Sequence, residues 1–398
     1  MFKMRRMAAL VIVAAGFALV QAQAAPGDEA QAPAQKKAKK AKKAAKADPN
    51  QPKPAAFMVG EKAYGIGPRG FGEITGGRLE DNLALLASYK KPPEVMFKLY
   101  EAAYKALAAR PDATYMDVAS DPDVQKICKD NGIDALGGPM LASVTSDGAS
   151  VWVRTARPAK VEVQVAIVRG PDKTFGPVAA TAESDLSAVV KVTGLAPATT
   201  YAYRVLVDGK ALPVPDGGKA ELTTAPEAGA GGKVRIVFGS CFHRFGLGND
   251  MQAKAILARK PTAMLIYGDC AVQDRESNYG MHRADFLLRD MRPAWKMITS
   301  SVPVYDTWDD HDYFNNDKAG IAKNHTDADR RGVRAVFTKA WANPAYGLGD
   351  EGGGIFFHTR IGPADVIMLD NRYFRLNEKG SFLGPEQTQW LKSELLAC

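Results

Sequence analysis

The stretch V-P-V-Y-D-T-W-D-D-H-D-Y-F-N-N-D, Val302 to Asp317, places a short apolar strand directly before a run of charged residues. Its β-branched residues predict a buried strand. Four ionisable side chains, Asp309 to Asp312, then follow without a break. Carboxylates this close together repel one another unless a cation compensates them, and burying them unpaired is costly. The run is therefore either a solvated acidic loop or a cation site at the carboxyl end of a strand, where α/β enzymes place their ligands.

Three further predicted strands end in the same way. They are Val234 to Cys241, which closes in Gly-Ser-Cys, Ala263 to Cys270, which closes in Gly-Asp-Cys, and Ala364 to Arg375, which contains Asp370 and Arg372. Four strands that all stop at metal-type or phosphate-type residues are much rarer by chance than one. The strand ends therefore predict a shared metal or phosphate site.

In this order, F-G-S-C, Y-G-D, T-W-D-D-H-D-Y-x-x-N-D and L-D-x-R-Y-F-R resemble the motifs of the PhoD-like alkaline phosphatases (alkaline phosphatase D), a branch of the metallophosphoesterases. The resemblance covers roughly residues 136–398. It implies an α/β metallophosphoesterase-like layered sheet domain, preceded by an immunoglobulin or fibronectin III-like β-sandwich. It also implies an exported enzyme that hydrolyses phosphomonoesters or phosphodiesters with activated water at a dinuclear metal site.

The resemblance and the residue types together give a predicted ligand set. The metal ligands are Cys241, Asp269, Cys270, Asp310, Asn315 and Asp370, with Asp269 as the bridging carboxylate. A thiolate at Cys241 suits iron or zinc, whereas carboxylate and amide oxygens suit Ca²⁺ or Mg²⁺. We therefore expect two or more metal ions, Fe³⁺ with Ca²⁺ first and Zn²⁺ or Mg²⁺ as alternatives. The simpler reading of Cys241 is a small buried apolar residue.

Two residues are predicted to act on the substrate. His311 is expected to contact the phosphate or protonate the leaving group, unless it is a structural histidine, and Arg372 to bind phosphate through its planar guanidinium. The residues expected to orient them or line the pocket are Asp309, Asp312, Asp317, Tyr373, His243 and Arg244.

The chain departs from the family pattern at two places. Cys270 stands where the family usually has Tyr or Asn, so it is either a substitute ligand or one half of a disulfide with Cys241. The sequence also stops at Cys398, before the segment in which the family carries a Gly-Asp-x-His ligand motif. From this we expect an incomplete site, poor activity and an unpaired sheet edge.

The N-terminal part has a different composition. Residues 1–24 predict a secretory signal, with basic residues before a short apolar run, and residues 25–56 a flexible linker rich in Lys, Ala and Pro. Residues 1–50 hold ten basic and three acidic residues, so +7 of the total charge of +8 lies there. The folded part is nearly neutral, and we predict no nucleic-acid-binding domain. The expected location is periplasmic or extracellular, with a possible loose contact between the linker and the envelope.

The remaining residues divide into three predicted regions: helices over 57–135, a β-sandwich over 136–226 and the phosphatase domain over 233–398. In the sandwich, Trp152 is the predicted core tryptophan, and Gly194 to Tyr203 predict a tyrosine corner. In the last region one helix is expected from Asp285 to Ser300. We expect a monomer that binds a phosphate ester. The alternative is a catalytically inactive secreted protein whose sandwich binds an envelope partner.

Overall fold

The computed structural model of the chain describes residues 9–13, 56–59, 62–65, 77–89, 91–242, 246–376 and 380–397. Most of the predicted signal segment and linker lies outside these residues, as do His243 and Arg244. The first described elements are three short strands, β1 (Ala9–Val13), β2 (Ala56–Val59) and β3 (Lys62–Gly65). The β2-β3 hairpin falls at the start of the region predicted to be helical.

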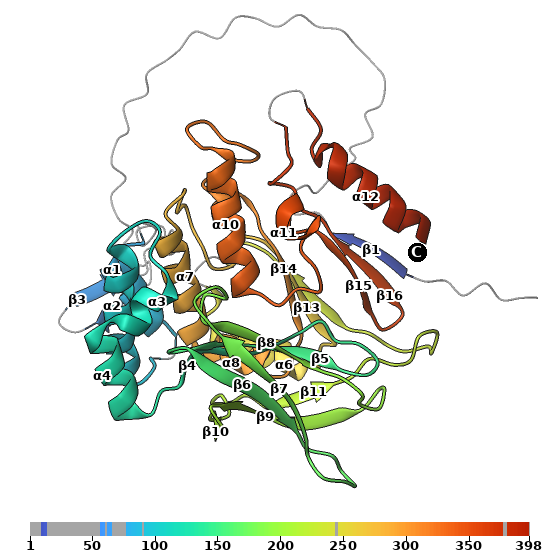
Figure 1. The fold of residues 1–398 in the computed structure, drawn as a ribbon, viewed down its shortest axis with the longest axis horizontal. Helices are drawn as coiled ribbons and strands as arrows, with labels where there is room; N and C mark the ends of the chain where they lie inside the picture. The colour runs from blue at the N-terminus through green and yellow to red at the C-terminus, as the bar shows by residue number, and fades with distance from the viewer. Residues whose placement is uncertain are drawn as a thin grey trace, which may run out of the picture.

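Four helices follow the hairpin: α1 (Leu79–Ala87), α2 (Glu94–Ala108), α3 (Tyr115–Ser120) and α4 (Pro122–Asn131). Local chemistry sets their ends. Thr114 and Asp117 form a capping box at α3, Asp121 caps α4, and Gly132 ends α4 with a φ of +60°. The helices share an apolar core with α7 of the C-terminal part, beside which they lie (Figure 1).

Two antiparallel sheets follow. Their strands are β4 (Ala135–Ala142), β5 (Ala149–Thr155), β6 (Ala159–Val165), β7 (Lys173–Ala180), β8 (Ser187–Val192), β9 (Thr200–Val207), β10 (Lys210–Ala211) and β11 (Glu221–Thr223). One sheet has the order β4-β5-β8, and the other β10-β9-β6-β7 with β11 on β9. The Ala196 N–H donates to the Tyr201 hydroxyl over 2.9 Å, the hydrogen bond expected of a tyrosine corner.

Trp152 does not lie in the interior of the two sheets, where the sequence placed it. Val151 and Val153 point into the sandwich core, so Trp152 between them points to the opposite face of β5. There it packs in the core of the C-terminal part and donates from Nε1 to the Lys339 carbonyl over 3.0 Å. The tryptophan therefore joins the two parts of the chain.

The C-terminal part is built on three parallel strands, β12 (Ile236–Gly239), β13 (Ala263–Tyr267) and β14 (Val304–Thr307), in that order. Helices α6 (Asp250–Ala258), α7 (Tyr279–Met291), α8 (Pro293–Thr299), α9 (Asp310–Tyr313) and α10 (Asp327–Ala340) connect or follow them. The predicted helix from Asp285 to Ser300 was wrong. It is two helices, because Pro293 cannot donate the hydrogen bond that would continue α7.

The fourth predicted strand belongs to a second sheet of order β1-β16-β15, with β15 at Phe357–Ile361 and β16 at Ala364–Met368. Short α11 (Gly349–Gly352) precedes it and α12 (Gly384–Ala397) follows it. The Thr307 hydroxyl donates to the Leu369 carbonyl over 2.9 Å, so the ends of β14 and β16 still meet. Among the helices described, none is long and apolar enough to cross a membrane.

Candidate metal centre

The site lies where the loops after β13 and β14 touch. Gly268 has a φ of +82°, and a Cβ atom there would be 2.3 Å from the Asp309 backbone nitrogen. Only glycine allows the two loops to approach this closely. Asp269, the next residue, is buried and also has a positive φ, of +51°. The Gly-Asp pair therefore brings one carboxylate of the first loop against the charged run of the second.

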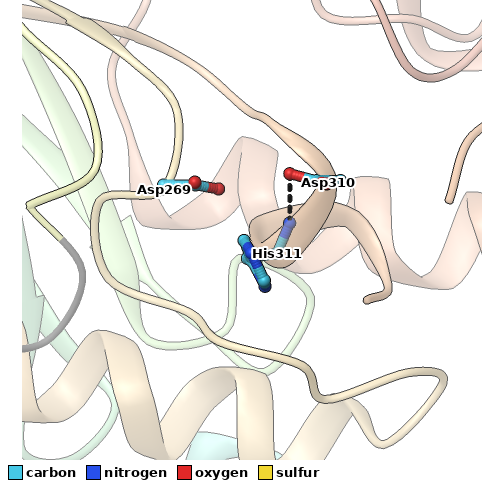
Figure 2. A group of neighbouring side chains, drawn as sticks. All are labelled: Asp269, Asp310 and His311. Atoms are coloured by element: carbon cyan, nitrogen blue, oxygen red, sulfur yellow. Dashed lines mark hydrogen bonds between the residues drawn. The ribbon is translucent and has the colours of Figure 1, made fainter. Parts of the chain in front are cut away.

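Three predicted functional residues meet at this contact. One ligand atom each of Asp269, Asp310 and His311 lies within 4.8 Å of the others (Figure 2). Asp269 comes from the loop after β13, and the other two begin α9. Asp310 is fixed by backbone donors, because its Oδ1 accepts from the His311 N–H at 3.1 Å and its Oδ2 from the Asp317 N–H at 2.6 Å. Two carboxylates and an imidazole in this arrangement can hold a metal ion.

The electrostatics of the group favour a cation. Burial, followed by repulsion from Asp309, raises the pKa of Asp269 to about 6. Carboxylates near His311 favour its charged form. Its Nδ1 lies 2.6 Å from Asp274 Oδ1, and this hydrogen bond raises the pKa of His311 to about 9, against the effect of burial. The surroundings of Asp269 thus favour its protonated carboxyl, whereas the imidazole of His311 is held protonated at neutral pH.

Asp274 was not predicted from the sequence. It binds His311 twice, because its backbone N–H also donates to the His311 carbonyl over 3.1 Å. Its φ is +57°, so the loop after Asp269 turns sharply to bring it there. Nothing in the local sequence marks it, since the pairing exists only once the loops after β13 and β14 come together.

The two predicted thiol ligands have different environments. Cys241 is exposed after β12, and its Sγ donates to Asp269 Oδ2 over 3.5 Å, so it adjoins the metal-type group. Although the residue is exposed, partial burial of its thiol, and then the Asp269 carboxylate, raise the pKa of that thiol. Cys270 is buried in the apolar core and is not in the group. Both are free thiols in this structure, which does not contain the disulfide considered above.

Arg372 points its guanidinium at the charged run. Its Nε donates to Asp309 Oδ1 over 2.7 Å and its Nη2 pairs with the same oxygen. The Nη2 is also 3.6 Å from Asp310 Oδ1. The guanidinium that the sequence assigned to phosphate therefore contacts Asp309 in this structure, and the orienting role of Asp309 stays a prediction.

Asp370 is fully buried, and its carboxylate accepts several protein donors. Oδ1 accepts from Trp308 Nε1 at 2.7 Å and from the N–H groups of Arg372 and Tyr373 at 2.9 Å each, and Oδ2 accepts from the Ile355 N–H at 3.0 Å. The Tyr373 ring stacks on the Trp308 ring, with centroids 6.3 Å apart. These contacts fix the loop after β16, so the geometry gives Asp370 an orienting role, and its role as a ligand stays a prediction.

Asp312 closes the first turn of the run. Its Oδ2 accepts from the N–H groups of Asp309 and Cys270 at 3.4 Å each, which ties the two loops together. Asp317 is exposed and supplies a backbone donor to Asp310, while its own carboxylate accepts from Asn316. The orienting roles predicted for Asp312 and Asp317 stay predictions.

Asn315 lies in a separate cluster around Glu276, a residue that the sequence did not single out. Its Nδ2 donates to Glu276 Oε1 over 2.8 Å. The Lys318 ammonium lies 2.9 Å from the same oxygen, and His325 Nε2 lies 3.0 Å from Oε2. This cluster secures the loop that follows α9, and the predicted metal contact of Asn315 stays a prediction.

Comparisons with known proteins give one family match in each of two parts of the chain. The family model for PhoD-like phosphatase matches residues 272–398, and one described as a domain of unknown function (DUF7800) matches residues 134–224. No curated protein matches the chain. The solved structure of PhoD is similar with a TM-score of 0.54 and 21% identity, over 65% of this chain and 59% of that one.

The purple acid phosphatase PPD1 from seeds of yellow lupin (Lupinus luteus) gives a TM-score of 0.46 and 15% identity, over 65% of this chain and 48% of that one. The chain therefore spans somewhat more than half the length of the PhoD structure that it matches. At 21% identity the PhoD structure supports the fold alone, and the family model supports the sequence relationship of residues 272–398. Residues 272–398 match the family model for PhoD-like phosphatases, and the chain is similar in fold to the PhoD structure.

Proposed function

We propose that this protein is an exported, metal-dependent phosphatase that hydrolyses phosphomonoesters or phosphodiesters at a dinuclear centre. The observation that carries the proposal is the grouping of Asp269, Asp310 and His311 within 4.8 Å, after two paired parallel strands. This is the sheet edge at which α/β enzymes bind their ligands. The PhoD-like match over residues 272–398 supports the same chemistry.

Asp269 and Asp310 would hold the metal ions, with Cys241 as a thiolate beside Asp269. The raised pKa of Asp269 supports this, because it reflects burial and, after it, nearby negative charge that a dication would neutralise. When bound, the metals supply charge for the phosphoryl oxygens and acidify a water molecule. The mixed donors, one thiol among oxygens, favour Fe³⁺ with Ca²⁺, with Zn²⁺ or Mg²⁺ as alternatives. Cys270, Asn315 and Asp370 remain predicted further ligands.

His311 would donate the proton to the leaving alkoxide or bind a phosphoryl oxygen. Its hydrogen bond to Asp274 keeps the imidazole protonated at neutral pH, which is the state that a general acid needs. Arg372 stays the predicted phosphate contact, with Asp309 setting the direction of its guanidinium. These side chains orient the ester and supply a proton, while the carboxylates bind the cations.

The test compares Asp269→Asn and Asp310→Asn with Asp172→Asn, a change of the same kind on the remote sandwich. Metal content by elemental analysis is the first readout, and hydrolysis of p-nitrophenyl phosphate and its bis-ester is the second. Both site variants should lose metal and hydrolysis together, because each removes an anionic ligand. Metal content equal to that of the Asp172→Asn control in both variants would contradict the proposed centre.

Several finer points belong to the same proposal. They are a periplasmic or extracellular location, a monomeric state, a loose contact between the Lys-rich residues 36–46 and acidic envelope polymers, and an immunoglobulin or fibronectin III type for the two-sheet unit. The last is supported by the strand order and by the Ala196–Tyr201 hydrogen bond.

A further inference from the structure

A cavity of about 810 Å³ lies between the two-sheet unit and the C-terminal part. Residues from the sandwich side, such as Thr223 and Lys219, face residues from α6, α8 and the β15-β16 turn. Helix α8 contacts β4 of the two-sheet unit. A volume of this size is typical of sites for small organic ligands, and such sites often lie between domains.

This cavity is not the candidate metal centre. It is lined by Pro261 and Thr262, which precede β13, and by Val302 and Pro303, which precede β14. The metal-type group follows the opposite ends of the same two strands. None of the three grouped residues lines the cavity. A ligand bound here would therefore be separated from the metal centre by the length of the sheet.

The floor of the cavity is apolar and buried. Met297, Val302, Pro303 and Tyr305 are all buried and line it, and Leu257 adds a partly buried side chain. The Tyr305 hydroxyl accepts a hydrogen bond from the Val144 N–H over 3.1 Å, so this group is already used within the protein. The floor suits a ligand with a hydrocarbon or aromatic body, whose burial is favourable by about 25 cal/mol per Å² of apolar surface.

The rim of the cavity is basic. Among the described residues that line it, four are basic and exposed, Lys219, Lys254, Lys260 and Arg360, and one is acidic, Glu221. Two of these charges already have partners, since Lys254 pairs with Asp250 at 2.9 Å and Lys219 lies 4.0 Å from Glu221. The ammonium groups come from both parts of the chain, so an anion between them would interact with the sandwich and with the C-terminal part at once.

From this combination we propose that the cavity is a binding site for an amphipathic organic anion, with its apolar body on the floor and its anionic group at the lysine rim. The site is separate from the proposed phosphatase centre, so its ligand need not be a phosphate ester. A ligand that contacts both parts of the folded chain also raises thermal stability, because it binds the native state and not the unfolded one.

The test uses two probes that share one ring system. 8-Anilinonaphthalene-1-sulfonate carries a sulfonate, and N-phenyl-1-naphthylamine has the same rings without it. Neither is a phosphate ester, so binding is independent of hydrolysis. In fluorescence titrations of the full chain, the sulfonate should bind with one-to-one stoichiometry and at least tenfold more tightly than the neutral probe, and it should raise the melting temperature.

Three variants assign the binding to this cavity. Lys219→Glu with Lys260→Glu should weaken the sulfonate at least tenfold and leave the neutral probe within twofold, whereas Lys98→Glu with Lys191→Glu, the matched control at remote exposed positions, should change neither. Ala258→Trp, which fills the cavity from its exposed edge, should abolish both. Circular dichroism checks that each variant is folded. Equal affinity for the two probes, no saturable binding, or sulfonate binding that survives both cavity variants would overturn the proposal.

Discussion

Replacing Gly268 by Ala should separate the two loops that form the candidate metal centre. The new Cβ would lie 2.3 Å from the Asp309 nitrogen and 2.6 Å from the Trp308 carbonyl carbon, whereas real Cβ contacts stay beyond 3.0 Å. The loops must therefore move apart by about 0.7 Å or more, which is the difference between the 2.3 Å contact and the 3.0 Å limit. Ligand distances in metal sites tolerate only about 0.2 Å. Metal affinity should fall about 10- to 100-fold, as when a supporting contact of a metal site is lost.

A matched control separates the two contributions to the stability cost of Gly268→Ala, which are backbone strain and overpacking. Gly209 has a φ of +78°, close to the +82° of Gly268, but a Cβ there meets nothing within 4 Å. Gly209→Ala should therefore cost only the left-handed backbone strain, about 1 kcal/mol. Gly268→Ala should cost that plus about 1–3 kcal/mol of overpacking. The assays are chemical denaturation and calorimetric titration with metal. If the two variants unfold alike and bind metal alike, the loops are not in the contact described.

Three other predictions each concern one buried or hydrogen-bonded side chain. Asp274→Asn should lower the pKa of His311 from about 9 toward 6.5, seen by NMR titration, and move the alkaline limb of hydrolysis to lower pH; an unchanged pKa would remove the proposed role of this pair. His282 is buried with its pKa lowered to about 4, so the unfolded state binds its proton first and stability falls as pH drops from about 6.5 to 4. His282→Gln should reduce that loss of unfolding free energy by about 3 kcal/mol, measured by chemical denaturation at the two pH values. An equal loss in the original protein and the variant would contradict this. Gln387→Leu should cost about 2–4 kcal/mol, because two buried backbone groups lose their partner, while Gln389→Leu on the exposed face of α12 should be nearly neutral; equal costs would be inconsistent with the buried amide contacts.

Much of the fold could be predicted because local chemistry determines it. Asp121 and Gly132 mark the ends of α4 in the sequence as they do in the structure. Strand β9 alternates as its sequence indicates. The helix break at Pro293 was missed because the apolar pattern continues across it. Trp152 was assigned to the wrong side, because alternation shows that a strand has two faces but not which core each face meets.

The candidate site was predicted in outline for a similar reason. Asp269 and Asp310 sit at strand ends, and parallel strands bring their carboxyl ends to one edge, so their meeting follows from the topology. Asp274 and Glu276 escaped notice because they lie in an irregular loop and pair with residues about forty positions away. Such pairs depend on loop geometry, for which a single sequence carries no periodic signal.

Strand β5 has a consequence for how the protein can be divided. All seven of its residues are buried, because one face packs in the sandwich and the other against the C-terminal part. A sandwich expressed alone would expose Trp152 and Arg154 to water. The C-terminal part expressed alone would expose the apolar core that Trp152 covers. The two-sheet unit is therefore unlike a tethered accessory module that can be exchanged between proteins. It should melt together with the rest of the chain in a single transition. Replacing residues 134–224 by the corresponding unit of another protein should be tolerated only when the new unit keeps the surface that packs on α8 and α10.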